Sequence, residues 1–550
     1  MAHDYAAVLQ PLTRHINDRD LLALARGFAA TYDRLARHSK QHFLATPVTA
    51  LPTGRETGVF LAIDVGGTNL RVAFVELLGE AADHDDSSAA QSHGEARKPP
   101  KIRRSHERAW PIEEHLKMDQ ADELFAWIGD CIAGVVADAL NDASLRVQDL
   151  DEIPMGITFS FPMKQDSISR ATLMPMGKGF GIVSDLNLGE MLLAGYARHC
   201  TDMTPATNGH PPPEKATATA AAAAPTTAAA TRLPRLRIAA ITNDTVATYA
   251  SLAYSSNSRV AMGLVVGTGT NATVPMPVSS LAAFKTAPLD LLSRGPSGSS
   301  PDVVVVNTEW SVVGTDEPLR ALGVPTPWDA ALSAACESPG FQPVEYMTAG
   351  RYLGELVRLV LVQLLLPPEE GGRAEGLPPR LLEKNAVSTR FLATAVALAD
   401  DDDALKRSLD ELFPPPPPSA AGGVFAWTAQ RVGLLRAVAE AVQVRSAALV
   451  AAMIVGLLAR VGEVQLDGEA GGDDGAAEEV VVEKEELVVA HTGGVILQYP
   501  GYLEICEKWI DTLISKGSRR NAGKRVVLSE AKDGGVIGAA VLAGMFAEVR

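Results

Sequence analysis

Two short glycine turns carry the first chemical signal in this 550-residue sequence. In segment 59–75, two apolar runs flank the turn Gly66-Gly67-Thr68-Asn69; in segment 261–274, two more flank Gly267-Thr268-Gly269-Thr270. Apolar, β-rich runs on both sides of a tight turn are typical of a hairpin. Glycine lets the backbone approach a ligand closely, and its N–H groups can bind an anion together with Thr and Asn side chains. The two hairpins therefore predict two related lobes that hold a polyphosphate between them.

Asp64 ends the first apolar run, immediately before the first glycine turn. A carboxylate at that place can hold Mg²⁺, usually through water, and the ion neutralises phosphate charge. The alternative is a turn residue whose side chain hydrogen-bonds its own backbone.

Two common nucleotide-binding motifs are excluded. Gly267 to Ala272 matches GxGxxA, but that fingerprint requires a helix to follow, and Pro275 and Pro277 rule out a regular helix there. The sequence has no GxxxxGK[ST] motif, so a P-loop is absent. Taken singly, each glycine turn could still be a plain hairpin turn.

Composition limits the class of protein. The formal net charge of -17 argues against nonspecific nucleic-acid binding, which depends on a basic surface. The four cysteines lie far apart without a CxxC pair, and the N-terminus lacks the features of a secretory signal, so we expect a reduced, cytoplasmic setting. No apolar run reaches the roughly 18 residues of a membrane span. The longest, 447–459, reads as a buried helix, and no membrane partner is expected.

Four biased stretches interrupt the chain. Residues 1–45 have helical spacing of apolar positions, whereas 80–101, 204–231, 400–422 and 467–486 lack the periodicity of a core and are expected to be solvated insertions. The basic run from Arg97 to Arg104 is read as a solvated loop, with an anion or targeting patch as the alternative.

Many short blocks, in order, resemble the hexokinase family. They are Pro47 to Gly58, Asp64 to Arg71, Thr158 to Pro162, Gly177 to Phe180, Thr242 to Thr245, Gly267 to Asn271, Asn307 to Trp310, Glu345 to Glu355 and a weaker echo from Ser529 to Ala540. The resemblance covers nearly everything except the four insertions. It implies a two-lobed α/β fold of the actin-like ATPase (ribonuclease H-like) group, with a small and a large domain around a cleft.

This resemblance also implies domain boundaries. Residues 1–50 would be a helical segment packing on the large domain. The small domain would span 51–242 and the large domain 243–527, with 528–550 a C-terminal helix returning to the small domain.

The family's roles can be carried over where residues match. Asp244 corresponds to the base that takes the proton of the sugar 6-hydroxyl, and Lys178 would offset charge on the transferring phosphoryl group. The resemblance assigns sugar contacts to Ser160, Phe161, Gly177, Lys178, Asn243, Asp244, Asn271, Glu309 and Glu345. It assigns ATP contacts to Asp64, Gly66, Gly67, Thr68, Asn69, Arg71, Gly267, Thr268, Gly269, Thr270, Gly493 and Gly494, with Mg²⁺ held by Asp64 through water.

Each residue also has a simpler role. Asp244 could cap the helix expected after it, Lys178 could be a helix-cap charge, and Glu309 could be a surface residue beside a core tryptophan.

Departures from the family pattern bear on the substrate. Hexokinases usually have Trp-Thr-Lys-Gly-Phe, whereas Met176-Gly177-Lys178-Gly-Phe180 lacks the Trp and the Thr, and Ser311 stands where glycine is usual. The family's Asp-Gly-Ser turn appears as Thr492-Gly493-Gly494, which makes the adenine side of the site less certain. The Met-Gly-Lys-Gly-Phe form, with Trp110 to Met118 and Asp122 to Gly129, resembles the divergent fungal branch assigned as N-acetylglucosamine kinases.

The resemblance therefore favours phosphorylation of N-acetylglucosamine at its 6-hydroxyl by MgATP. The alternatives are a glucokinase or broad hexokinase, and a catalytically silent sugar sensor on the same scaffold. We expect a monomer or a homodimer.

Overall fold

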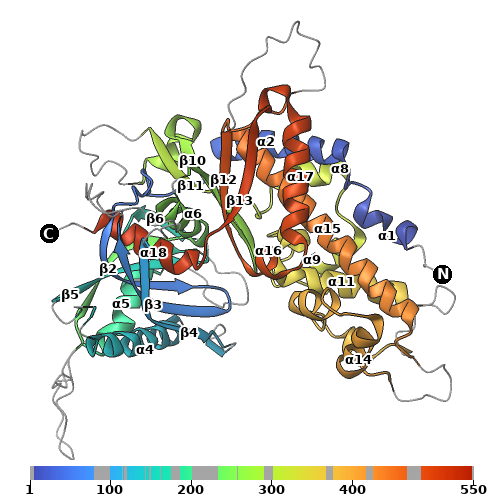
Figure 1. The fold of residues 1–550 in the computed structure, drawn as a ribbon, viewed down its shortest axis with the longest axis horizontal. Helices are drawn as coiled ribbons and strands as arrows, with labels where there is room; N and C mark the ends of the chain where they lie inside the picture. The colour runs from blue at the N-terminus through green and yellow to red at the C-terminus, as the bar shows by residue number, and fades with distance from the viewer. Residues whose placement is uncertain are drawn as a thin grey trace, which may run out of the picture.

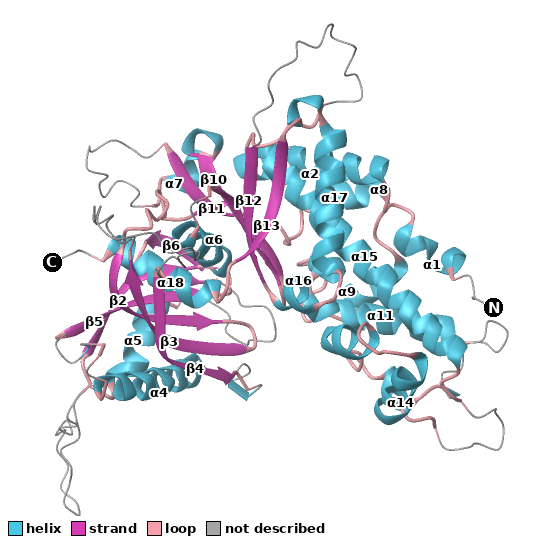
Figure 2. Ribbon diagram, in the orientation of Figure 1, coloured by secondary structure: helices cyan, strands magenta, loops and turns pink. Residues whose placement is uncertain are grey.

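Two lobes, each built on a mixed sheet, make up the computed structural model (Figures 1 and 2). It describes residues 5–79, 100–113, 115–116, 121–142, 144–145, 147, 150–161, 163–174, 186–200, 233–256, 258–289, 302–366, 376–416, 425–467 and 485–547. The expected insertion at 204–231 and the motif residues Gly177 and Lys178 lie outside these ranges, as do most of 80–101 and 467–486.

The small lobe contains a five-stranded sheet in the order β4-β3-β2-β5-β8. Its strands are β2 (Thr57–Val65), β3 (Asn69–Leu78), β4 (Ile102–Pro111), β5 (Glu152–Phe159) and β8 (Arg235–Thr242), and a separate hairpin joins β6 (Met163–Ser167) to β7 (Arg170–Leu173). Strands β2 and β3 pair antiparallel, with Val65 opposite Leu70, which confirms the first predicted hairpin.

Helices cover both faces of this sheet. Along β2, Leu61 and Ile63 join the core under α4 (Ala121–Leu140) and α5 (Leu188–Ala197), whereas Phe60 and Ala62 join the core under α18 (Gly534–Phe546). This alternation follows the two-residue period of a strand whose two faces are both buried.

The large lobe holds a six-stranded sheet in the order β1-β11-β10-β9-β12-β13. Its strands are β1 (Leu44–Ala45), β9 (Val260–Val266), β10 (Thr270–Pro277), β11 (Val303–Asn307), β12 (Glu485–Thr492) and β13 (Lys524–Glu530). Val266 lies opposite Thr270 in an antiparallel pair, so the second predicted hairpin is confirmed. Strand β10 continues to Pro277, which agrees with the exclusion of a dinucleotide fingerprint.

A helical layer packs against the large sheet (Figure 1). It contains α1 (Ala6–Thr13), α2 (Asp18–His38), α8 (Glu317–Leu322), α9 (Pro327–Ala334), α10 (Glu345–Thr348), α11 (Gly350–Leu365), α15 (Ala429–Arg460), α16 (Gly494–Gln498) and α17 (Tyr502–Gly517). Shorter pieces complete the lobe: α7 (Ala283–Thr286), α12 (Pro379–Leu382), α13 (Thr389–Phe391) and a π-helical turn, Leu392–Val396.

Helix α15 is long and apolar enough to cross a membrane, but 94% of its apolar stretch is buried inside the molecule. The expected buried helix at 447–459 is therefore confirmed as part of α15.

Helices α6 (Asp244–Ser255) and α18 pack against each other between the two sheets. A Cβ on Gly538 would lie 2.0 Å from the carbonyl oxygen of Ala247, so only glycine permits this approach. Helix α18 brings the C-terminal part of the chain onto the small-lobe sheet, and α2 brings the N-terminal part onto α15 and α17.

Two expectations about insertions were wrong. Residues 402–412, expected to be part of a solvated insertion without core periodicity, form α14 (Asp402–Leu412). Asp401 caps its start, acidic residues suit its first turn, and Leu405 and Leu409 are buried. The end of the basic run also lies in β4, where Arg103 pairs with Glu76 across the sheet.

Candidate active site

A cleft of about 450 Å³ collects the predicted residues from both lobes. The nineteen that the structure describes all line it: Asp64, Gly66, Gly67, Thr68, Asn69, Arg71, Ser160, Phe161, Asn243, Asp244, Gly267, Thr268, Gly269, Thr270, Asn271, Glu309, Glu345, Gly493 and Gly494. They lie at the ends of strands, in the hairpin turns of the two sheets, and at the starts of helices such as α6 and α10. The roles assigned to them remain predictions, whereas their gathering in one cleft is an observation.

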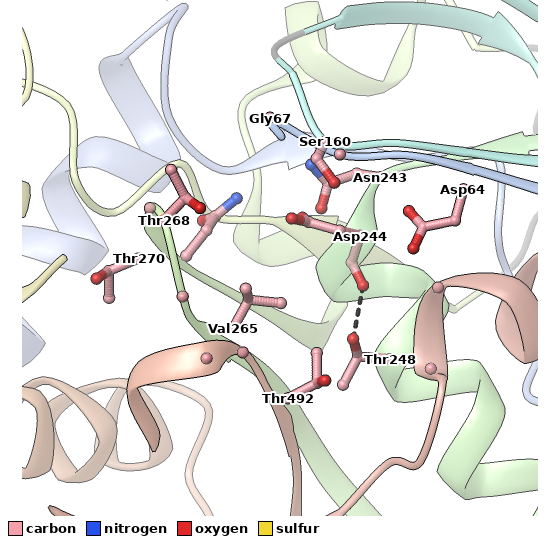
Figure 3. Close-up of a pocket in the computed structure, with 18 of the residues that line it drawn as sticks. Asp64, Gly67, Ser160, Asn243, Asp244, Thr248, Val265, Thr268, Thr270 and Thr492 are labelled. Carbon is pink, nitrogen blue, oxygen red and sulfur yellow. Dashed lines mark hydrogen bonds between the residues drawn. The ribbon is translucent and has the colours of Figure 1, made fainter. Parts of the chain in front are cut away.

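Asp244 is the first residue of α6 and points into the cleft (Figure 3). The alternative that it caps the helix is wrong, because Asn243 is the N-cap and its Oδ1 accepts from Thr245 N at 2.8 Å. The hydroxyl of Thr248 donates to the backbone carbonyl of Asp244 at 2.7 Å, which ties this residue to the next helical turn. The carboxylate of Asp244 is therefore placed by a capped helix start without itself serving as the cap.

Asp64 lies across the cleft floor from Asp244 at the end of β2 (Figure 3). The pKa of its carboxyl is raised to about 7, chiefly by burial; Arg71 opposes this rise, and the nearby carboxylates of Asp244 and Asp533 add to it. A carboxylate surrounded by other carboxylates is stabilised in its charged form by a cation. Among the described residues, no group of three or more His, Cys, Asp or Glu side chains could hold a metal ion. A single carboxylate such as Asp64 can hold Mg²⁺ through water.

Glycines allow the second turn and the segment before α16 to pack closely together. A Cβ on Gly267 would lie 3.3 Å from the Cα of Gly493, and one on Gly493 would lie 2.4 Å from the backbone of Val266. Gly493 also has a φ of +118°, which side-chain-bearing residues rarely adopt. The backbone here can therefore approach a phosphate chain closely, which the residues predicted for ATP require.

Two buried carboxylates, Glu309 and Glu345, line the large-lobe side of the cleft. Glu345 accepts from the backbone N–H of Thr270 at 3.0 Å, and Glu309 accepts from Asn307 Nδ2 at 2.8 Å. Glu309 has a φ of +48°, an uncommon conformation for a residue other than glycine, which supports a functional position and not a chance surface site. Amide and carboxylate groups of this kind suit a ligand rich in hydroxyls.

Several cleft residues were missed by sequence reasoning: Thr248, Val265, Phe341, Gln342, Leu497, Gln498, Glu530, Lys532, Asp533, Gly534 and Gly535. Asp533 pairs with Arg104 at 2.7 Å and with Arg71 at 3.8 Å, so Arg71 has a partner besides any phosphate. For Glu530 to Gly535, the sequence signal was the weak resemblance to the family at 529–540. No sequence pattern pointed to Arg104, because the basic run that contains it is typical of a solvated loop.

Comparison with known proteins decides the family. Two family models, both described as hexokinase, match residues 9–254 and 261–545. This chain belongs to the hexokinase family. Hexokinases transfer a phosphoryl group to an alcohol, so it is a sugar kinase.

Individual relatives agree with that assignment. Hexokinase-2 of Oryza sativa subsp. japonica is 29% identical over 513 residues, 93% of this chain and 84% of the relative. The hexokinase of Schistosoma mansoni is 31% identical over 348 residues, 63% of this chain and 60% of the relative. The structure of a Schistosoma mansoni hexokinase complexed with glucose shares the fold, with a TM-score of 0.69, 24% identity and 98% of each chain covered. The predicted two-lobed hexokinase fold is confirmed.

Proposed function

We propose that this hexokinase transfers the terminal phosphoryl group of ATP to the 6-hydroxyl of N-acetylglucosamine, with Asp244 as the base. The observation that carries the reaction is the gathering of Asp244, Asp64 and both glycine turns in one cleft. Hexokinase-family kinases use ATP, generally with Mg²⁺, and the cradle and donor set described above suit both.

The chain's own groups have separable tasks in this mechanism. The two glycine turns would bind and orient the phosphates. Asp64 would hold Mg²⁺ through water, and the ion would supply charge neutralisation. Asp244 accepts the proton of the 6-hydroxyl as the oxygen attacks. Lys178, which lies outside the described residues, would approach when the cleft closes and offset phosphoryl charge.

The choice of sugar rests on departures from the family pattern. Gly177 replaces a larger side chain beside Lys178, and an acetamido group needs such room. On the large-lobe side, Ser311 and Phe341 line the cleft, and Gln342 Nε2 donates to the Ser311 hydroxyl at 3.4 Å. These side chains offer an apolar surface and polar partners that suit an acetamido group.

Two other functions stay open to test. A glucokinase or broad hexokinase is favoured by the names of the relatives, all of which are called hexokinase. A silent sugar sensor is disfavoured, because Asp64, Lys178 and Asp244 are all present. We also propose a cytoplasmic monomer or homodimer without nucleic-acid or membrane partners.

The decisive experiment is a substrate panel. Turnover is measured with N-acetylglucosamine, glucose and mannose at saturating MgATP, with release of ADP as the signal. The proposal predicts the highest kcat/KM for N-acetylglucosamine. A preference for glucose would support the broad-hexokinase alternative, and sugar binding without ADP release would support the sensor.

A further inference from the structure

An unbroken chain of side-chain hydrogen bonds runs behind the cleft wall. The backbone N–H of Ala272 donates to Asn271 Oδ1 at 2.8 Å, and Asn271 Nδ2 donates to Asn307 Oδ1 at 2.8 Å. Asn307 Nδ2 then donates to Glu309 Oε1 at 2.8 Å. Asn307 therefore lies between two residues that are predicted to contact the sugar.

The chemistry of the groups fixes the direction of this chain. A carboxylate accepts hydrogen bonds only, so the amide nitrogen of Asn307 must face Glu309 and its oxygen must face Asn271. Asn271 must then present its nitrogen to Asn307, and its oxygen accepts from Ala272 N and the Thr308 hydroxyl at 3.3 Å. Each of these bonds joins a donor to an acceptor, so a flip of either amide would bring two donors or two acceptors face to face and lose bonds.

Asn307 also supports the unusual backbone of Glu309. Its Oδ1 accepts from the backbone N–H of Glu309 at 3.4 Å, next to the residue's φ of +48°. Asn307 itself is 5% exposed at the end of β11, where it is held between Thr273 of β10 and Leu44 of β1. A rigid strand end therefore orients both the backbone and the carboxylate of Glu309.

We propose that Asn307 is a positioning residue that sets the orientation of Asn271 and Glu309 for the sugar. It acts through these two residues and need not touch the substrate. The inference rests on the proposed function in one respect, namely that Asn271 and Glu309 contact the sugar. It holds for whichever hexose is preferred.

Two variants separate hydrogen bonding from packing. Asn307 also borders a second cavity of about 300 Å³, so Asn307→Ala removes packing as well as hydrogen bonds. Asn307→Asp keeps the shape and the acceptor for Asn271, but it turns the donor facing Glu309 into a carboxylate oxygen. Two carboxylates at this distance repel, so the isosteric change should misplace Glu309 at least as much as truncation does.

The experiment measures kcat and KM for the sugar and for MgATP in both variants, with thermal unfolding to confirm folding. We expect the sugar KM to rise about 10- to 100-fold, the effect of leaving one buried polar group without its partner, while the MgATP KM stays within about twofold.

Asn521→Ala is the matched control. Asn521 is another buried asparagine of the large lobe, with Nδ2 donating to two backbone carbonyls, of Gln465 and Ile514, and it does not line the cleft. It should lower stability without changing the sugar KM.

Two results would overturn the inference while leaving the proposed function intact. One is an Asn307→Asp enzyme with a wild-type sugar KM, and the other is an equal rise of the sugar and MgATP KM values. Failure of the proposed function looks different, because the wild-type enzyme would then release no ADP with any hexose. If one Asn307 variant does not fold, the ratio of the sugar KM to the MgATP KM in the other still tests the inference.

Discussion

At the scale of single residues, the site depends on positions without a side chain, where other groups can come close. Gly535 shows this most clearly: a Cβ added there would lie 2.5 Å from Asp64 Oδ2. The start of α18 can approach the Asp64 carboxylate only because this position has no side chain. Gly535 is thus part of the proposed magnesium site, although it supplies no ligand.

Gly535→Ala should therefore displace Asp64 and raise the KM for MgATP about tenfold, while the sugar KM changes little. Steady-state kinetics with each substrate varied in turn would measure this. Gly134→Ala is the control, because this half-buried glycine lies in α4, and a Cβ there would make only an ordinary contact, 3.5 Å from the Arg108 guanidinium. Equal MgATP KM values for the two variants would contradict this account of Gly535.

At the scale of elements, the packing of α18 on α6 determines where the carboxylate of Asp244 lies. Asp244 begins α6, and α18 packs on α6 through Gly538 with almost no space between the backbones. A substitution at Gly538, which does not line the cleft, should therefore shift α6 and with it the position of Asp244.

We expect Gly538→Ala to lower the free energy of unfolding by about 1–3 kcal/mol, because overpacking forces the helices apart. It should also lower kcat, since α6 carries Asp244. Urea unfolding and kcat measured on the same preparation test this prediction. A variant that is as active and as stable as the wild type would show that the helices adjust without moving the base.

Sequence predicted the hairpins and many of the residues that line the cleft, but it missed features that depend on contacts between distant parts of the chain. Both glycine turns were recognised because strand periodicity and turn residues are local. Helix α14 was missed because an acidic, proline-flanked segment has a biased composition, although Leu405 and Leu409 have helical spacing. The pairing of Asp533 with Arg104 joins residues more than 400 positions apart, which no local pattern reveals.

At the scale of the whole molecule, one buried histidine links stability to pH. His491 lies in β12, between β9 and β13 in the large sheet, and is 1% exposed. Among the described residues its Nδ1 has no hydrogen-bond partner, and burial lowers its pKa to about 4. In the unfolded chain the same group would titrate near the ordinary value of about 6.5.

Because the folded pKa is the lower one, the unfolded chain takes up the proton first as pH falls. His491 should therefore reduce the free energy of unfolding progressively between about pH 6.5 and 4, by up to about 3 kcal/mol. Urea unfolding across this range, compared with His491→Leu, isolates the contribution. Parallel curves for the two proteins would show that His491 does not titrate differently in the two states.

The role of Asp244 as the base is tested most directly by Asp244→Ala. The measurement is kcat with the preferred sugar at saturating MgATP, alongside sugar affinity from calorimetry. We expect kcat to fall by about 10²- to 10⁴-fold, the usual contribution of a general base, while sugar binding stays measurable. Turnover at the wild-type rate would show that Asp244 is not the base.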